Sequence, residues 1–339
     1  MTTSVSTSSS QLPHEQKIVQ GLIHSKELAY SNYLLEKHQL PTSGRWNSLE
    51  KSLTKEVSDK SKAQALVSLE ALTDRIITSS DHTYQIIKVS QTEHSEILKA
   101  LQNFDMAPYK SMYKEFYPSK VTFVPGGNYP TGDFLCKVVD LGDGIASIFT
   151  SVTKEKSKVS QEFHYRQEFH SVFVPHSSKH IQFRVSNKTP TSLVSSSFTQ
   201  LEQSFINILD GNVKVSNWVP VNVYNAIEAL FDDQKEGRVQ FGMMTISQTG
   251  DDAELNGRTR KGYCARKVGL EDEVNNYDYI CRGLRVRYDY SDKSGFETEL
   301  SITPHKRDWE AKDCLSFAIK HPENSSTLAR MIEKILTRA

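Results

Sequence analysis

The segment that decides the fold class is Glu162-Phe-His-Tyr-Arg-Gln-Glu-Phe-His-Ser-Val-Phe-Val174. Aromatic side chains occupy odd positions of its sequence, whereas charged and polar side chains occupy most of the even ones. The aromatic set is Phe163, Tyr165, Phe169 and Phe173, and the polar set is Glu162, His164, Arg166, Glu168 and His170. Because successive side chains of a strand point to opposite faces of a sheet, this period of two predicts a β-strand with one apolar and one charged face.

The segments on either side of this strand have the same period. Residues 134–150 are typical of a β-hairpin, because Asp143 and Gly144 supply the backbone conformations that a tight turn needs. Apolar side chains in 181–185 continue the buried set, with Arg184 on the outward side. The centre of the chain is therefore predicted to be antiparallel sheet.

Apolar residues before this sheet recur at helical spacing. Between residues 18 and 34 they lie three, four or seven positions apart, as one buried helix face requires. We expect a helical domain or arm over 13–117, preceded by a loose Ser/Thr-rich tail over 1–12. At Pro118 the period changes from about 3.6 to 2, which marks a boundary.

Strands and helices alternate over the rest of the chain. We expect antiparallel strands plus a helix over 118–210, then a helix, an antiparallel sheet and a C-terminal helix over 211–339. Because both parts end in an amphipathic helix, 118–339 is alternatively one β-rich domain with a loose internal repeat. The predicted fold class is α+β, with an N-terminal helical region followed by an antiparallel β-rich region with covering helices.

Composition excludes several classes of protein. The 339 residues include 41 basic and 41 acidic side chains, so any nucleic-acid contact must come from a local patch. The cysteines, Cys136, Cys264, Cys281 and Cys314, form no closely spaced pair, which favours reduced thiols over disulfides or a zinc ribbon. No apolar run approaches the roughly 18 residues of a membrane span, and the N-terminus lacks a signal-peptide pattern. We therefore expect a cytoplasmic protein without membrane contact.

The strongest candidate binding element is the basic loop Asn256-Gly-Arg-Thr-Arg-Lys-Gly-Tyr-Cys-Ala-Arg-Lys267. It holds no carboxylate, and its cations are Arg258, Arg260, Lys261, Arg266 and Lys267. Guanidinium forks, flexible glycines and a tyrosine ring are the groups that contact phosphates and bases. Acidic residues at 251–254 and 271–273 flank the loop, so the alternative is a solvated hairpin whose charges are neutralised locally.

Two further arginines, Arg285 and Arg287, are predicted to be structural. They alternate with apolar residues in one strand, and Glu297 and Glu299 alternate in the same way in the next. If residues 291–295 form the turn, the opposite charges meet across the ladder, where each pair contributes about 0.2–1 kcal/mol. The basic loop must therefore carry the nucleic-acid hypothesis almost alone.

A second candidate surface lies on the charged face of the sheet. His164, Arg166, His170 and Arg184 are all predicted to point outward, where they would form an anion-binding surface. The histidines lack the spacing of metal ligands, so no metal site is expected.

Nuclease chemistry is the weakest alternative. Glu310 and Lys312 have a Glu-x-Lys spacing, and Asp292 precedes them in a plausible order for a metal-dependent nuclease. Asp292 falls in a predicted turn, however, and Glu310 precedes its strand. No cofactor motif accompanies them.

The sequence therefore favours a non-catalytic binding protein over an enzyme. Its β-rich part would contact nucleic acid or another polyanion through the loop 256–267, and its helical region would self-associate or dock a protein partner. The alternatives are an assembly or adaptor subunit without nucleic-acid contact and a metal-dependent nuclease.

Overall fold

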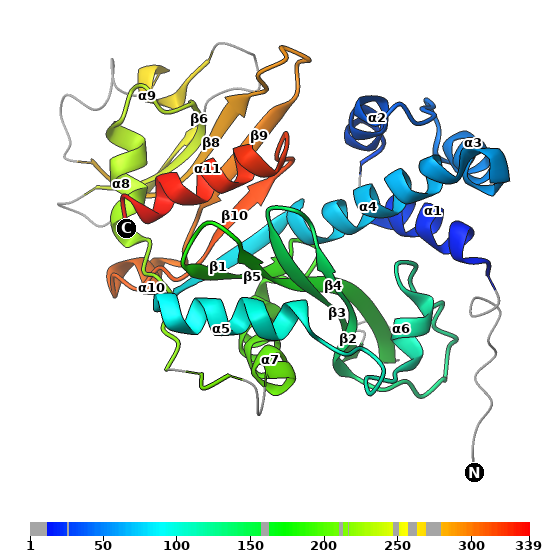
Figure 1. The fold of residues 1–339 in the computed structure, drawn as a ribbon. Coiled ribbons are helices and arrows are strands. Elements are labelled where there is room, and N and C mark those ends of the chain that lie inside the picture. Colours follow the sequence, from blue (N-terminus) through cyan, green and yellow to red (C-terminus); the bar gives the residue numbers. More distant parts are fainter. Residues whose placement is uncertain are drawn as a thin grey trace. The chain divides into compact units, whose positions relative to one another are not determined.

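The computed structural model describes residues 12–25, 27–156, 163–209, 213–215, 217–246, 251–256, 263–268 and 279–339. The fold is mixed α+β, as the sequence predicts (Figure 1). The chain divides into two compact units. Unit 1 comprises Met1–Thr78 with Ser90–Ser216, and unit 2 comprises Ser79–Val89 with Asn217–Ala339.

In the part of unit 1 that the structure describes, four antiparallel strands form the sheet. They are β2 (Gly132–Asp140), β3 (Gly144–Lys156), β4 (Phe163–Pro175) and β5 (His180–Ser186), and each pairs with the next. The predicted hairpin at Asp143 and Gly144 is present, because β2 and β3 pair on either side of it. β4 pairs with β3 over its whole length, which places Phe149 opposite His170.

Helices line both faces of this sheet. The described helices of unit 1 are α1 (His14–Ser25), α2 (Leu28–Lys37), α3 (Trp46–Ser58), α4 (Ala63–Ser79), α5 (Gln91–Gln102), α6 (Met112–Phe116) and α7 (Thr191–Leu209), and those on the two faces of the sheet include α7 and α4. On one face Phe205 of α7 packs edge-on against Phe183 of β5, with ring centroids 6.1 Å apart. On the other, Ile77 of α4 packs with Ile148 and Phe169.

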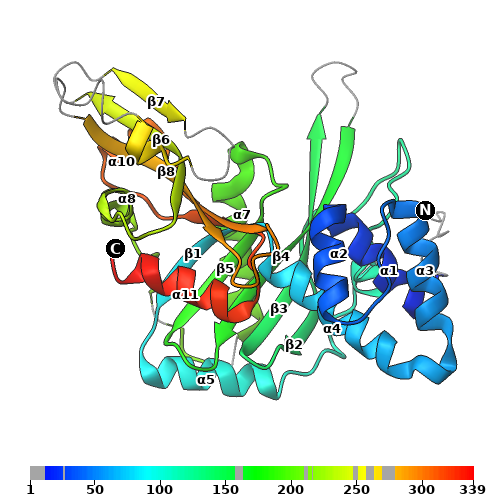
Figure 2. The ribbon, with the colours of Figure 1, turned by 90° about the horizontal axis from the view of Figure 1, so that it is seen from above.

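The N-terminal helices build a core of their own within unit 1 (Figure 2). Its centre consists of fully buried leucine and isoleucine side chains from three helices: Ile18, Leu22, Leu49, Leu53 and Leu69. Unit 1 thus contains these helices together with β2–β5, whereas the sequence pattern predicts a boundary at residue 118. Among the described residues no helix is long and apolar enough to cross a membrane.

The described residues of unit 2 form six antiparallel strands. In sheet order they are β1 (His82–Lys88), β10 (Phe317–Lys320), β9 (Glu297–Ile302), β8 (Tyr279–Asp289), β6 (Arg238–Ile246) and β7 (Asp252–Asn256). The helices of this unit are α8 (Tyr224–Asp232), α9 (Ala265–Val268), α10 (Lys306–Glu310) and α11 (Ser325–Leu336).

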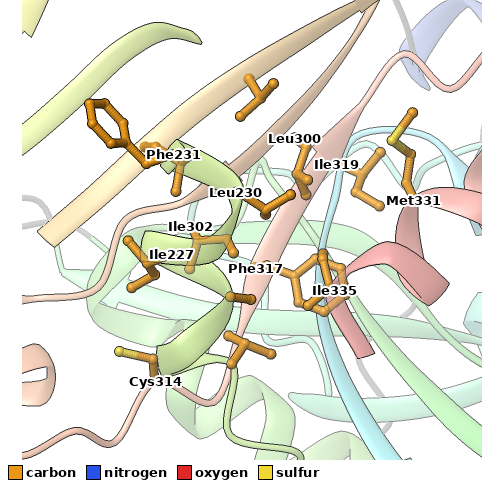
Figure 3. Packing of buried hydrophobic residues seen from close by; sticks show 14 of the residues in the cluster. Ile227, Leu230, Phe231, Leu300, Ile302, Cys314, Phe317, Ile319, Met331 and Ile335 are labelled. Carbon is orange, nitrogen blue, oxygen red and sulfur yellow. The ribbon is translucent and has the colours of Figure 1, made fainter. Parts of the chain in front are cut away.

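Two amphipathic helices close the core of unit 2 (Figure 3). Ile227 and Leu230 of α8 lie in one cluster with Ile302 of β9 and with Met331 and Ile335 of α11. The N-terminus of α11 is capped by Asn324, whose side chain accepts a hydrogen bond from the Thr327 amide. Because the apolar stripe of α11 is fixed in the core, its neighbouring positions Arg330 and Lys334 are held beside the β8–β9 hairpin.

Candidate polyanion-binding pocket

A cavity of about 640 Å³ lies in unit 2 where α11 meets the β8–β9 hairpin and the start of β6. Cationic side chains outnumber carboxylates in its lining. The cations are Arg238, Arg287, Lys293, Arg330 and Lys334, and the carboxylates are Asp289 and Glu297. Three aromatic residues, Tyr288, Tyr290 and Phe296, also line the cavity. Its volume lies within the range of small-molecule binding sites.

Two of these cations are neutralised by the sheet itself. Glu297 accepts from Arg238 at 2.6 Å and from Arg287 at 3.1 Å. A second carboxylate, Glu299, lies 3.2 Å from Arg287 and 3.3 Å from Arg285. The predicted ladder between these arginines and glutamates is confirmed, because Arg287 pairs directly with Glu299 in the strand register.

Lys334 forms an ion pair with Glu236, whose carboxylate is almost buried. Glu236 also accepts from Arg338 at 3.0 Å and from the Tyr288 hydroxyl at 3.2 Å. Burial, and then the Glu236 charge, raise the pKa of the Tyr288 hydroxyl far above its usual value, so this hydroxyl remains a donor. The ammonium group of Lys334 lies 5.0 Å from the centroid of the Tyr288 ring. Glu236 therefore anchors α11 and compensates one pocket cation.

The remaining two cations, Lys293 and Arg330, share the cavity with one further carboxylate, Asp289. Both side chains are exposed, and within the described residues neither forms an ion pair or a side-chain hydrogen bond. Lys293 comes from the turn between β8 and β9, where its φ of 56° places it in the left-handed region, and Arg330 comes from α11. Tyr290 and Phe296 flank that turn with ring centroids 5.9 Å apart. Two free cations beside aromatic rings can bind a phosphate next to a planar group.

The structure describes only part of the basic loop that was predicted from the sequence. Arg258, Arg260 and Lys261 lie outside the described residues, and so does the side chain of Lys267. Arg266 is described, and its placement corrects the prediction. Its side chain is buried and donates to the carbonyl oxygens of Leu230 at 2.6 Å and Glu236 at 2.7 Å. Arg266 therefore stabilises the fold and is not a surface contact.

The predicted anion surface on the β4 face does not form. Arg184 pairs with Ser171 across the β4–β5 ladder, so its side chain lies on the same face of the sheet as the odd-numbered residues of β4. His170 points to the other face. The guanidinium of Arg184 is buried, donates to the Thr78 carbonyl at 2.7 Å and lies 4.1 Å from the Phe173 ring. The prediction was wrong because the second half of β4 is buried on both faces, with α7 packed on one face of the sheet and α4 on the other, which strand periodicity alone does not reveal.

The other members of that surface are separated along the strand. His170 is fully buried, its Nδ1 accepts from the Ser186 amide at 3.3 Å, and burial lowers its pKa to about 4. His164 and Arg166 lie at the exposed start of β4. Arg166 donates to the Lys188 carbonyl at 3.1 Å. These four residues therefore do not converge on one ligand.

The residues of the nuclease alternative are also kept apart. Asp292 lies in the turn before β9, whereas Glu310 ends the helix that follows β9. The six residues of β9 span about 17 Å, and Asp292 precedes this strand whereas Glu310 follows it. Lys312 lies 6.0 Å from the Tyr224 ring centroid. In the described part of the chain, no group of three or more His, Cys, Asp or Glu residues could hold a metal ion.

The pocket residues escaped the sequence prediction because they come from separate segments. Arg238, Lys293 and Arg330 are supplied by β6, the β8–β9 turn and α11. One signal was available, since Arg330 and Lys334 are four positions apart on an amphipathic helix and so share a face.

Comparison with known proteins adds no functional information. No protein-family model matches the chain, and no curated protein is significantly similar to it in sequence.

Proposed function

We propose that the chain is a non-catalytic binding protein that contacts nucleic acid, or a similar polyanion, through unit 2. The observation that carries the proposal is the cavity in which cations outnumber carboxylates and in which Lys293 and Arg330, which form no ion pair among the described residues, lie in one lining with Phe296. Phosphate groups supply the negative charge that such cations attract, and bases supply planar surfaces for the aromatic ring.

The basic loop is the second part of this proposal. Arg258, Arg260 and Lys261 lie outside the described residues, and they enter the proposal on their charge and on the phosphate contacts that such side chains make. Arg266 is excluded, because its guanidinium is occupied by backbone carbonyl groups. A cytoplasmic location is also proposed, and the four free cysteines support it.

Self-association through the helical region receives less support. The apolar stripes of α1, α3 and α4 are buried against one another in the core of unit 1. They are therefore not available as a surface for a second copy or a partner helix. The nucleic-acid part of the proposal does not depend on them.

Fluorescence anisotropy with a labelled single-stranded oligonucleotide, measured at several salt concentrations, tests the proposal. Binding should weaken steeply as salt rises, because each neutralised phosphate releases counterions. Changing Arg258, Arg260 and Lys261 together to Ala should flatten the salt dependence if the loop contributes.

A duplex of the same sequence serves as the second probe. The absence of binding to either probe at low salt would contradict the proposal and favour an assembly or adaptor protein instead. If the loop variant binds as well as the unchanged protein, the loop is not a contact and only the pocket remains in the proposal. Arg307→Gln is the matched control, since Arg307 is 91% exposed in unit 2 and does not line the pocket.

A further inference from the structure

We infer that a second cavity of unit 2 binds an alkylammonium group, supplied by a lysine side chain or by a small free amine. This cavity has a volume of about 300 Å³ and lies where α8 meets the start of β8 and the helix α10. It shares no lining residue with the polyanion pocket, so the inference goes beyond the proposed function and does not depend on it.

The first step is the stripe that α8 presents to the cavity. Tyr224, Glu228 and Asp232 follow one another at intervals of four residues, so they lie on one face of the helix, and all three line the cavity. The strand β8 contributes Cys281 to the same lining. Burial raises the pKa of the Cys281 thiol to about 12, and the charges of Asp232 and Glu228 act in the same direction. Both carboxylates are therefore within electrostatic range of a single point in the cavity.

The second step is that these carboxylates have no partner among the described residues. Glu228 and Asp232 are exposed, and neither side chain forms an ion pair or a hydrogen bond with another described residue. The lining contains no cation. Lys312 lies 6.0 Å from the Tyr224 ring centroid without lining the cavity, and the buried guanidinium of Arg266 donates to backbone carbonyl groups. Two acceptor groups are thus available to a ligand.

The third step is that the two carboxylates are placed unfavourably for the fold itself. Like charges four residues apart on a helix repel each other. Asp232 is also the last residue of α8, where the helix dipole disfavours a negative charge, and the last turn of this helix has no basic residue to offset it. A cation bound in the cavity would relieve both effects, which gives the arrangement a role that stability alone does not.

The fourth step is the pair of aromatic rings, which selects an organic cation. Tyr224 and Trp309 both line the cavity and are half-buried, with ring centroids 6.2 Å apart and planes inclined by 39°. Aromatic faces attract alkylammonium groups, and nearby carboxylates accept their hydrogen bonds. A metal ion suits the lining less well, because within the described residues no group of three or more His, Cys, Asp or Glu side chains could hold one.

The test compares the binding of Nα-acetyl-lysine amide and Nα-acetyl-norleucine amide, measured by saturation-transfer difference NMR. The norleucine side chain has the same four carbons as lysine and lacks the ammonium group. We expect the lysine compound to bind about tenfold more tightly, as one exposed cation–π contact and one exposed ion pair together imply.

Substitutions then locate the binding site. Glu228→Gln and Asp232→Asn should each reduce the tenfold preference to about threefold or less, because each removes one of the two charges. Glu310→Gln is the matched control, since Glu310 is exposed and close to Trp309 in α10 but does not line the cavity. All three carboxylates are exposed, so circular dichroism should show an unchanged fold.

The probe n-butylammonium separates the two sources of the group. If it binds as tightly as the lysine compound, the site takes a free amine; if it binds more weakly, the amide groups contribute and the site takes a lysine side chain of a protein partner. Absent binding of the lysine compound, or equal binding of the lysine and norleucine compounds, would overturn the inference. A preference that survives both carboxylate substitutions would also overturn it, and each of these results leaves the proposed function intact.

Discussion

Replacing Glu236 by glutamine should weaken the fold and strengthen polyanion binding at the same time. Glu236 is almost buried and accepts from Lys334, Arg338 and Tyr288. Glutamine keeps one acceptor oxygen but removes the charge. Hydrogen bonds to charged groups contribute about 1.5–3 kcal/mol each, but the two cations retain about a quarter of their exposure and are partly solvated. We therefore expect a loss of about 1–2 kcal/mol in the free energy of unfolding.

The same substitution releases Lys334 into the pocket. One added phosphate contact should make the slope of log K against log salt for a single strand steeper by about 0.7. Unfolding in urea, followed by circular dichroism, gives the first quantity, and fluorescence anisotropy gives the second. Glu333→Gln is the matched control, because it removes the same charge from an exposed position of α11 that does not line the pocket. Unchanged or weaker binding by a folded Glu236→Gln protein would refute the idea that Glu236 restrains a ligand-binding cation.

Three further predictions concern buried groups. Arg266→Met should destabilise the protein by about 3 kcal/mol in urea, because it leaves buried carbonyl groups without a donor. The pKa of His170 falls from 6.5 to about 4 on folding, so only the unfolded chain is protonated between these values and stability should fall by about 3 kcal/mol as the pH drops through them; urea titrations of His170→Gln should lack this loss. Burial raises the pKa of Asp133 from 3.8 to about 6, so the free energy of unfolding should fall as the pH rises between these values and stay at the lower level above pH 6. Asp133→Asn should accordingly stabilise by about 3 kcal/mol at pH 8, and chemical denaturation at pH 3.5 should show that this advantage has disappeared.

Local periodicity predicts the elements in which neighbouring segments pair. β8 and β9 follow each other through a short turn, so their alternating patterns determine which side chains meet. Arg287 and Glu299 are opposite each other in the structure for that reason. The same reasoning identifies the apolar stripe of α11, whose buried members include Met331 and Ile335.

Pairing between distant segments is beyond such reasoning. The apolar run at residues 84–89 suits a strand or a helix end equally well, and only its partner β10, far along the chain, makes it the strand β1. Alternation along the chain predicts that Arg184 continues the outward set of β4, whereas the β4–β5 register places it beside Ser171 on the other face. Helices from other parts of the chain then bury both faces, which alternation within one strand does not encode.

The pocket illustrates the same limit for the candidate site. A run of charges can be recognised in a sequence, so the loop at 256–267 is predicted as a binding element. Lys293 and Arg330 are isolated cations and give no such signal. Their importance depends on which carboxylates lie nearby in space. Glu236, Glu297 and Glu299 pair with the other cations of the cavity, which leaves these two together with the carboxylate of Asp289.

The most direct test of the account is the salt dependence of oligonucleotide binding by the double variant Lys293→Gln/Arg330→Gln, compared with the unchanged protein. If these side chains neutralise strand phosphates, the slope of log K against log salt should become shallower by about 1.4, which corresponds to two lost contacts on a single strand. Identical slopes for the two proteins, with the fold intact, would show that the cavity in unit 2 is not where the polyanion binds.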